Sequence, residues 1–215
     1  MNKFFAFLKI IRPLNIFQSV IAVFITATLV SNFPSGMPLL LTMITIGSFI
    51  GAGNTINDFF DFETDRTNRP DRPLPAGTLT KPAVLIITLI LFLTGILAFF
   101  PVATRLSTGI LVINFILLII YTPLLKPTSI LGNVTVSYLL GSSFLFAAEI
   151  FGDYTAGIIP ALLAFLFNGS RELVKDMEDI KGDAENNIKT LPVKYGLTFS
   201  KGLAFFLILL IIEFF

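Results

Sequence analysis

The 215-residue chain contains no cysteine, no histidine and no tryptophan. Without cysteine it can form no disulfide and offers no thiol nucleophile, and without cysteine and histidine it lacks the ligands of the usual zinc sites. It also has no imidazole that could act as a general base near neutral pH. Any chemistry must therefore use aspartate, glutamate, asparagine, lysine, arginine, tyrosine or a bound metal ion.

Charged residues are scarce as well, at 13% of the chain, about half the fraction of a typical soluble domain. The net charge of +1 gives no reason to expect nucleic acid as a partner. Hydrophobic residues make up 54% and form runs of about 20 residues, the length of a membrane-spanning helix. The sequence predicts an all-α, polytopic transmembrane helix bundle, a single domain over residues 1–215, with spans near 14–32, 38–58, 82–101, 106–122, 129–148, 156–174 and 199–215.

The basic residues indicate how these spans are oriented. If the amino terminus lies in the cytoplasm, every Lys and Arg except Arg105 falls on the cytoplasmic side, in agreement with the positive-inside rule. The first 31 residues could be a secretory signal, but no convincing small-residue cleavage site precedes Ser31. We expect residues 1–12 to form a short amphipathic helix on the membrane surface, ended by Pro13.

Two acidic segments with the same spacing, NDFFDFETD and KDMEDIKGD, lie at the cytoplasmic ends of the second and sixth predicted spans. Steps of three and four residues predict that each aspartate trio lies along one face of a helix. Carboxylates beside hydrocarbon are costly unless they meet cations. The candidate catalytic and metal-binding residues are Asp58, Asp61, Asp65, Asp176, Asp179 and Asp183.

Magnesium that carries a diphosphate is the cation that best suits these acids, because Mg²⁺ accepts one or two carboxylates and shares the rest of its shell with phosphate oxygens. Each trio could instead belong to a solvated, ion-paired helix end. Asn54 and Asn57 argue against this for the first segment, since polar groups at membrane depth usually face a cavity or a partner. The second segment is supported by its matched spacing and its matched side of the membrane.

Basic and aromatic residues near the acids could bind the phosphates. Arg66, Arg69 and Arg72 follow the first trio at every third residue, and an arginine fork can bind phosphate through two hydrogen bonds. Lys126 follows Tyr121 at the inner end of the fourth span. Each basic residue could instead serve only to anchor its loop in the cytoplasm. The candidate substrate-binding residues are Asn54, Asn57, Arg66, Arg69, Arg72, Tyr121, Lys126, Arg171 and Lys175.

The matched positions of the acidic segments also suggest an internal repeat of four spans. Such a repeat would form a pseudo-symmetric bundle with a site on its axis. It would need at least one further span, so we expect more chain to follow residue 215.

The motifs resemble those of the UbiA-type intramembrane prenyltransferases. NDFFDFETD with RTNRPDRPLPAG is similar to the family's first signature, NDxxDxxxD followed by NRPxRPLPxG. KDMEDIKGDAENNIKTLPVKYG resembles the second aspartate-rich signature, and RPLN at 12–15 and YTPLLK at 121–126 also fit. Members of the family usually have nine spans, two more than the sequence predicts here.

The resemblance implies Mg²⁺-dependent transfer of a prenyl group from an isoprenoid diphosphate, with release of diphosphate. Within the family, RELVKDMEDIKGD is most similar to archaeal enzymes of ether-lipid synthesis, which transfer geranylgeranyl to a hydroxyl of geranylgeranylglyceryl phosphate. An aromatic acceptor of the quinone, chlorophyll or haem pathways is the alternative.

The resemblance also implies roles for the candidate residues. The six aspartates would hold Mg²⁺ against the diphosphate, and Asn54 and Asn57 would orient metal or phosphate. Tyr121 and Lys126 would contact the leaving group. The acceptor's phosphate would be received by Arg69 and Arg72.

Two other classes of membrane protein fit less well. A cation transporter could place Asp and Asn inside the membrane, but here the acids lie at the cytoplasmic ends beside arginines that would repel a cation. A structural scaffold would explain the spans but not the doubled acid spacing. We therefore expect a multi-pass enzyme of the cell membrane whose amino terminus and active-site loops are cytoplasmic.

Overall fold

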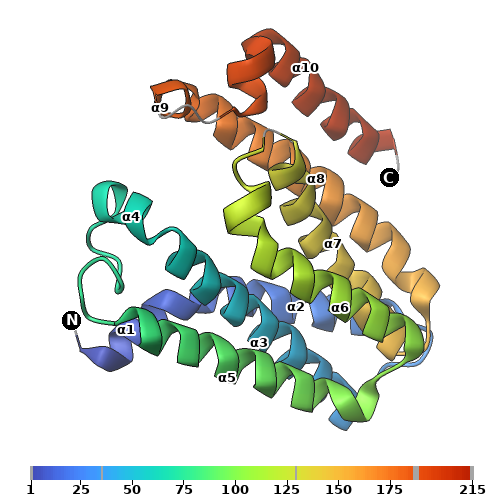
Figure 1. Ribbon diagram of the computed structural model, residues 1–215. Coiled ribbons are helices and arrows are strands. Elements are labelled where there is room, and N and C mark those ends of the chain that lie inside the picture. The colour runs from blue at the N-terminus through green and yellow to red at the C-terminus, as the bar shows by residue number, and fades with distance from the viewer. Residues whose placement is uncertain (1, 35, 129, 186–188, 214–215) are drawn as a thin grey trace.

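The computed structural model describes residues 2–34, 36–128, 130–185 and 189–213, without the side chains of Asp183 and Glu185 (Figure 1). Within these ranges the chain is all-helical and contains no strand. The helices are α1 (Lys3–Ile11), α2 (Pro13–Leu29), α3 (Met37–Phe60), α4 (Phe62–Asn68), α5 (Lys81–Phe99), η1 (Phe100–Val102), α6 (Arg105–Ile120), η2 (Tyr121–Leu125), α7 (Leu131–Ile150), η3 (Tyr154–Gly157), α8 (Ile158–Glu178), α9 (Ile180–Glu185) and α10 (Leu191–Glu213).

Six helical segments are long and apolar enough to cross a membrane. They are α3, α5 with η1, α6 with η2, α7, η3 with α8, and α10. The pair α1 and α2, bent by 46°, is a seventh candidate. The predicted polytopic helix bundle is therefore confirmed.

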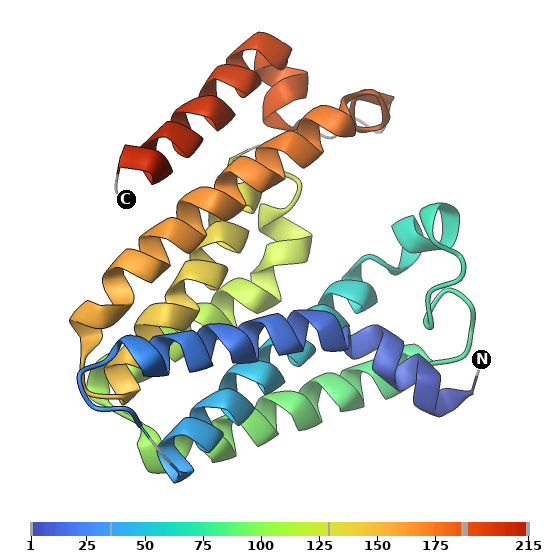
Figure 2. The same cartoon turned by 180° about the vertical axis from the view of Figure 1, so that it is seen from behind.

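The long helices form two groups that meet at the middle of the molecule. α3 packs against α5 and α2, whereas α8 packs against α7 and α10. Figure 2 shows α2 running across one side of the bundle, where it also contacts α7. α7 and α8 approach closely at Gly141, where an added Cβ would lie 2.7 Å from the carbonyl oxygen of Ala161. A side chain at position 141 would therefore force the two helices apart.

The short helix expected for residues 1–12 is observed as α1, and its place on the membrane surface stays a prediction. It ends at Ile11, and Pro13 begins α2, where the missing N–H of proline leaves no hydrogen bond unmade. Arg12, between the two helices, has φ 54° and is the only described non-glycine residue with a positive φ. α1 exposes Phe4 and Phe5, while Ile10 is buried.

Each acidic segment is interrupted at its middle aspartate. Asp61, with φ −77° and ψ 2°, separates α3 from α4, and Asp179, with φ −89° and ψ 3°, separates α8 from α9. Both residues lie close to the bridge region, where the regular helix is lost. The prediction that each trio lies along one face of one helix is therefore wrong. The matched breaks are a structural similarity between the two segments in addition to their spacing.

The last span also differs from its prediction. α10 begins at Leu191 rather than near residue 199, so part of the expected cytoplasmic loop is helical. Gly196, with φ 83° and ψ 164°, interrupts it and separates a short first part from the apolar remainder. Glycine adopts this backbone conformation without the steric cost that a side chain would bring.

Candidate functional site

A central cavity of about 570 Å³ lies among α2, α3, η2, α7 and α8. Its walls are mixed: amide, hydroxyl and guanidinium groups line part of it, and aliphatic or aromatic side chains line the rest. The polar lining is Asn15, Gln18, Ser19, Asn54, Asn57, Tyr121, Ser143, Asn168 and Arg171, and the apolar lining includes Ile50, Leu118, Leu139, Leu140 and Phe167.

Two further cavities border the central one. A small space of about 30 Å³ shares Ile50, Leu118, Leu139 and Ser143 with it and is lined mostly by apolar groups. An apolar cavity of about 490 Å³ shares Leu140 and Phe167 with it. The larger neighbour extends the apolar surface towards the outside of the bundle between α2 and α8.

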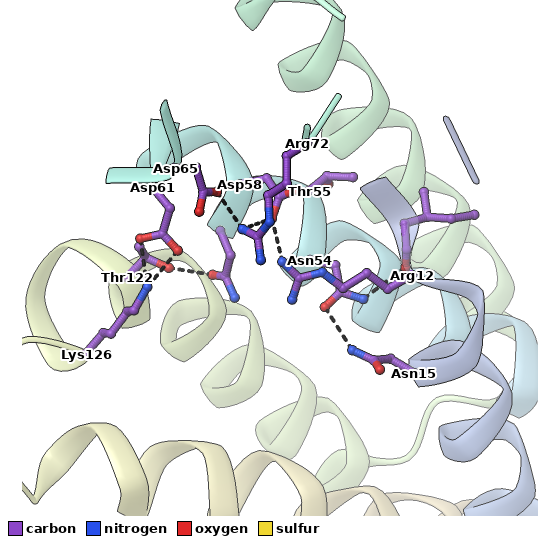
Figure 3. Close-up of polar contacts among 12 residues, drawn as sticks. Arg12, Asn15, Asn54, Thr55, Asp58, Asp61, Asp65, Arg72, Thr122 and Lys126 are labelled. Atoms are coloured by element: carbon purple, nitrogen blue, oxygen red, sulfur yellow. Dashed lines mark hydrogen bonds and ion pairs between the residues drawn. The ribbon is translucent and has the colours of Figure 1, made fainter. Parts of the chain in front are cut away.

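Asp58 on α3 is buried and held by two arginines (Figure 3). Asp58 Oδ1 lies 2.5 Å from Arg12 Nη2 and 3.3 Å from Arg72 Nη1. The same Arg72 nitrogen lies 2.5 Å from Asp65 Oδ2. We call these four side chains, Arg12, Asp58, Arg72 and Asp65, the charged row. Arg12 pairs with Asp58 and Arg72 bridges Asp58 and Asp65, so the row links the α1–α2 joint, α3, α4 and the following loop.

Asp61 has a different partner. Lys126 Nζ lies 2.8 and 2.7 Å from its two carboxylate oxygens, and Figure 3 shows this pair apart from the charged row. Next to it, Asn57 on the cavity wall accepts a hydrogen bond of 2.6 Å from Thr122 Oγ1. Tyr121 and Thr122 belong to the π-helical turn η2, a local widening that often occurs at functional sites, and Lys126 directly follows it.

Asn54 is oriented by the backbone of the α1–α2 joint. Its Nδ2 donates a hydrogen bond of 2.9 Å to the carbonyl oxygen of Ile11. Since a carbonyl oxygen can only accept, this contact fixes the orientation of the amide. Its Oδ1 then accepts from Asn15 Nδ2 at 3.5 Å. Asn54 thus links α1, α2 and α3 at the edge of the cavity.

The second acidic segment is less enclosed. Asp176 accepts a hydrogen bond of 2.8 Å from Asn133 on α7, and Asp179 is exposed at the break between α8 and α9. Glu172 is buried and pairs with Arg171 at 2.6 Å and with Lys175 at 3.3 Å. Asp183 lies in α9, and its side chain is outside the part that the structure describes.

Tyr121 connects the two acidic segments. Its phenol lies close enough to Asp61, Glu172 and Asp176 to interact electrostatically with all three, and it also lines the cavity. α4 and α9, which follow the two breaks, lie at the same end of the bundle in both views (Figures 1 and 2). The structure therefore brings Asp61 of the first segment and Asp176 of the second close to Tyr121, a residue of the cavity wall.

The three arginines of the first segment have different surroundings. Arg72 is enclosed in the charged row, whereas Arg66 lies on the outer face of α4, 3.5 Å from Glu63, with its guanidinium over the ring of Phe62. Arg69 is exposed at the end of α4.

Several polar residues at the site were not among the sequence candidates. Five of them make hydrogen bonds to other helices, which no spacing within one helix reveals, whereas Glu172 pairs with Arg171 and Lys175 of its own helix. The RPLN and YTPLLK motifs were the available signal for the first three of them. These residues are Arg12, Asn15, Thr122, Asn133, Asn168 and Glu172.

The oxygen donors at the cavity fit Mg²⁺. Asp61 and Asp176 offer carboxylates, and Asn57 offers an amide oxygen on the wall. Among the described side chains no three acidic groups are close enough to hold one ion by themselves. Mg²⁺ commonly takes one or two carboxylates and completes its octahedron with water and phosphate oxygens. The residues therefore suit a metal shared with a phosphorylated ligand.

Comparisons with known proteins agree with this site. The sequence profile of the UbiA prenyltransferase family matches residues 17–215. The chain is 37% identical to the digeranylgeranylglyceryl phosphate synthase of Methanothermobacter thermautotrophicus over 92% of this chain and 69% of that protein. It is 38% identical to the enzyme of the same name from Methanopyrus kandleri, over 89% of this chain and 70% of that protein.

A solved structure from work on digeranylgeranylglyceryl phosphate synthase in membranes has the same fold. Its TM-score is 0.87 at 33% identity, and the match covers 100% of this chain and 76% of the other. The resemblance read from the two aspartate signatures is thereby confirmed. The chain belongs to the UbiA prenyltransferase family and is a multi-pass membrane prenyltransferase.

Proposed function

We propose that this enzyme transfers the geranylgeranyl group of geranylgeranyl diphosphate to the hydroxyl of geranylgeranylglyceryl phosphate, in Mg²⁺-dependent ether-lipid biosynthesis. The central cavity is the observation that carries the proposal, because it joins an apolar wall suited to an isoprenoid with a polar region suited to a diphosphate. The relatives named digeranylgeranylglyceryl phosphate synthase support the choice of donor and acceptor.

The apolar wall binds the isoprenoid and keeps water from the reacting carbon. Leu118, Leu139 and Phe167 would contact the chain. The small space of about 30 Å³ cannot hold a tail of this size, whereas the neighbouring apolar cavity of about 490 Å³ offers additional room. The tail would therefore extend past Leu140 towards α8.

Asp61, Asp176 and Asp179 would hold Mg²⁺, and Asp183, whose side chain lies outside the described part of the chain, stays a candidate through its place in the second signature. Bound Mg²⁺ supplies positive charge that stabilises the departing diphosphate. Asp58 and Asp65 would first have to exchange arginine for the metal.

Positive side chains would bind the anionic groups. Lys126, which pairs with Asp61, and Arg171 and Lys175, which pair with Glu172, would orient the diphosphate between the two acidic segments. The phosphate of the acceptor would be bound by the exposed Arg66 and Arg69.

The decisive experiment is a choice of acceptors. Purified protein is incubated with Mg²⁺, geranylgeranyl diphosphate and either geranylgeranylglyceryl phosphate or 4-hydroxybenzoate, and the products are identified by mass spectrometry. We expect the lipid product, and we expect Asp61→Asn to reduce its formation by at least tenfold. Prenylation of 4-hydroxybenzoate alone would instead support an aromatic prenyltransferase.

A further inference from the structure

The aspartates of the first acidic segment already lie against basic side chains of the same protein. Asp58 and Asp65 pair with the arginines of the charged row, and Asp61 pairs with Lys126 through both carboxylate oxygens. A metal that binds any of these carboxylates must therefore compete with an internal cation.

Burial decides which of these pairs can exchange. The side chains of Asp58 and Arg72 are 4% and 15% exposed, so separating them would leave charges in a poorly solvated place. Lys126 and Asp61 are 47% and 18% exposed. An ion pair with this access to water contributes little net stability and can be replaced by other charges. Lys126–Asp61 is the exchangeable pair.

The ammonium group of Lys126 also occupies the place that a metal would need. At 2.7–2.8 Å from both oxygens, it blocks bidentate or bridging coordination by Asp61. No three acids among the described side chains converge on one point. A metal without a diphosphate would therefore gain too few protein ligands to offset the loss of the Lys126–Asp61 ion pair. A diphosphate removes both obstacles. It supplies oxygen ligands to the metal, and its negative charge gives the released Lys126 a new partner.

We propose that Lys126 is a placeholder cation that makes metal binding depend on the diphosphate. Mg²⁺ alone competes poorly with Lys126 for Asp61. When a diphosphate is present, Lys126 moves from the carboxylate to the phosphate oxygens, and Asp61 becomes available to the metal. The two ligands therefore bind cooperatively. The inference rests on the proposed function, and adds to it the coupling between metal and donor.

The test compares two binding measurements on purified protein in detergent. Binding of Mn²⁺ alone is followed through the electron paramagnetic resonance signal of the free ion, and binding of radiolabelled pyrophosphate is measured in excess Mg²⁺. For Lys126→Gln we expect Mn²⁺ alone to bind about three- to fivefold more tightly than to the wild type. Pyrophosphate should bind about tenfold more weakly.

Opposite changes in the two affinities distinguish a placeholder from a residue that merely supports the fold, since loss of structure would weaken both. Lys126→Arg keeps a cation near Asp61 and should leave Mn²⁺ affinity at the wild-type value. Lys9→Gln is the matched control, because it removes a lysine from another Lys–Asp pair, Lys9–Asp71, outside the site. It should change neither affinity.

Two results would overturn the proposal in distinguishable ways. If Lys126→Gln binds Mn²⁺ no more tightly than the wild type while Asp61→Asn abolishes binding, Asp61 is a ligand and Lys126 does not compete. If Asp61→Asn changes neither Mn²⁺ nor pyrophosphate binding, the metal site of the proposed function fails together with the placeholder.

Discussion

Arg12 combines a strained backbone with a mostly buried ion pair. A left-handed conformation such as its φ of 54° costs a non-glycine residue on the order of 1 kcal/mol or more. Pro13 contributes to this geometry, because a proline disfavours the right-handed helical conformation of the residue before it. The contact with Asp58, 4% exposed, offsets the strain.

Two substitutions of Arg12 should separate the cost of its backbone strain from the contribution of its ion pair with Asp58. Arg12→Ala keeps the strain and removes one partner of Asp58, so we expect a loss of about 1–3 kcal/mol of stability. Arg12→Gly loses the same contact but tolerates the positive φ, and should be roughly 1 kcal/mol more stable than Arg12→Ala. Thermal unfolding in detergent measures both, and equal stability of the two variants would show that the backbone is not strained.

The Lys9–Asp71 pair should give a small pH dependence. The hydrogen bond and charge of Lys9 lower the pKa of Asp71 from its usual 3.8. A depressed carboxyl pKa adds stability above the unfolded value, and this stability is lost as the pH falls through the folded value. Lys9→Gln should therefore melt slightly below the wild type at pH 7, and the difference should shrink as the pH falls below 3.8 and Asp71 becomes protonated in both proteins. A difference that persists in acid would point to another cause.

Sequence reasoning identified Asp61, Tyr121 and Lys126, which the structure brings together, because all three belong to recognisable motifs. It missed Arg12, whose partner Asp58 lies 46 residues along the chain. Spacing within one helix carries no information about such a contact. The metal ligands and substrate contacts stay predictions.

At the level of elements, the breaks at Asp61 and Asp179 could not be predicted. The aspartates keep their three- and four-residue spacing in the sequence whether or not the helix bends between them. No proline or glycine at position 61 marks the end of α3. On either side of the break the aspartates have different partners: Asp61 pairs with Lys126, whereas Asp58 and Asp65 pair with the arginines of the charged row.

The π-helical turn η2 should matter through Thr122. Thr122→Val removes the hydroxyl that donates to Asn57 at 2.6 Å and leaves the amide oxygen unpaired. We expect kcat/KM for prenyl transfer to fall about five- to thirtyfold, corresponding to about 1–2 kcal/mol. Thr122→Ser keeps the hydroxyl and is the matched control. Equal activity of the two variants would show that this contact does not position Asn57.

At the scale of the whole molecule, the length and composition of the hydrophobic runs predicted the helical membrane architecture well. A bilayer requires spans of about 20 apolar residues whose backbone groups are hydrogen-bonded within the helix. They could not predict which spans are neighbours. α3 packs against α5, and α8 against α7 and α10, through apolar surfaces that look alike in sequence.

The absence of cysteine allows a direct test of orientation, since any introduced cysteine is unique. Thr67 is exposed on α4 and Ala103 is exposed between η1 and α6. With a cytoplasmic amino terminus, a membrane-impermeant maleimide should label Ala103→Cys on intact cells and Thr67→Cys only after lysis. The reverse pattern would contradict the positive-inside assignment.

The close approach of α7 and α8 at Gly141 has a consequence for the acidic residues at the other end of α8. α8 carries Asp176 and Glu172 at its far end, and α7 packs against η2, which contains Tyr121. We therefore expect the separation of α7 and α8 to affect the distance of these acids from Tyr121. A single methyl group at position 141 would act as a wedge. It would move Glu172 and Asp176 away from Tyr121 although it contacts none of these three residues.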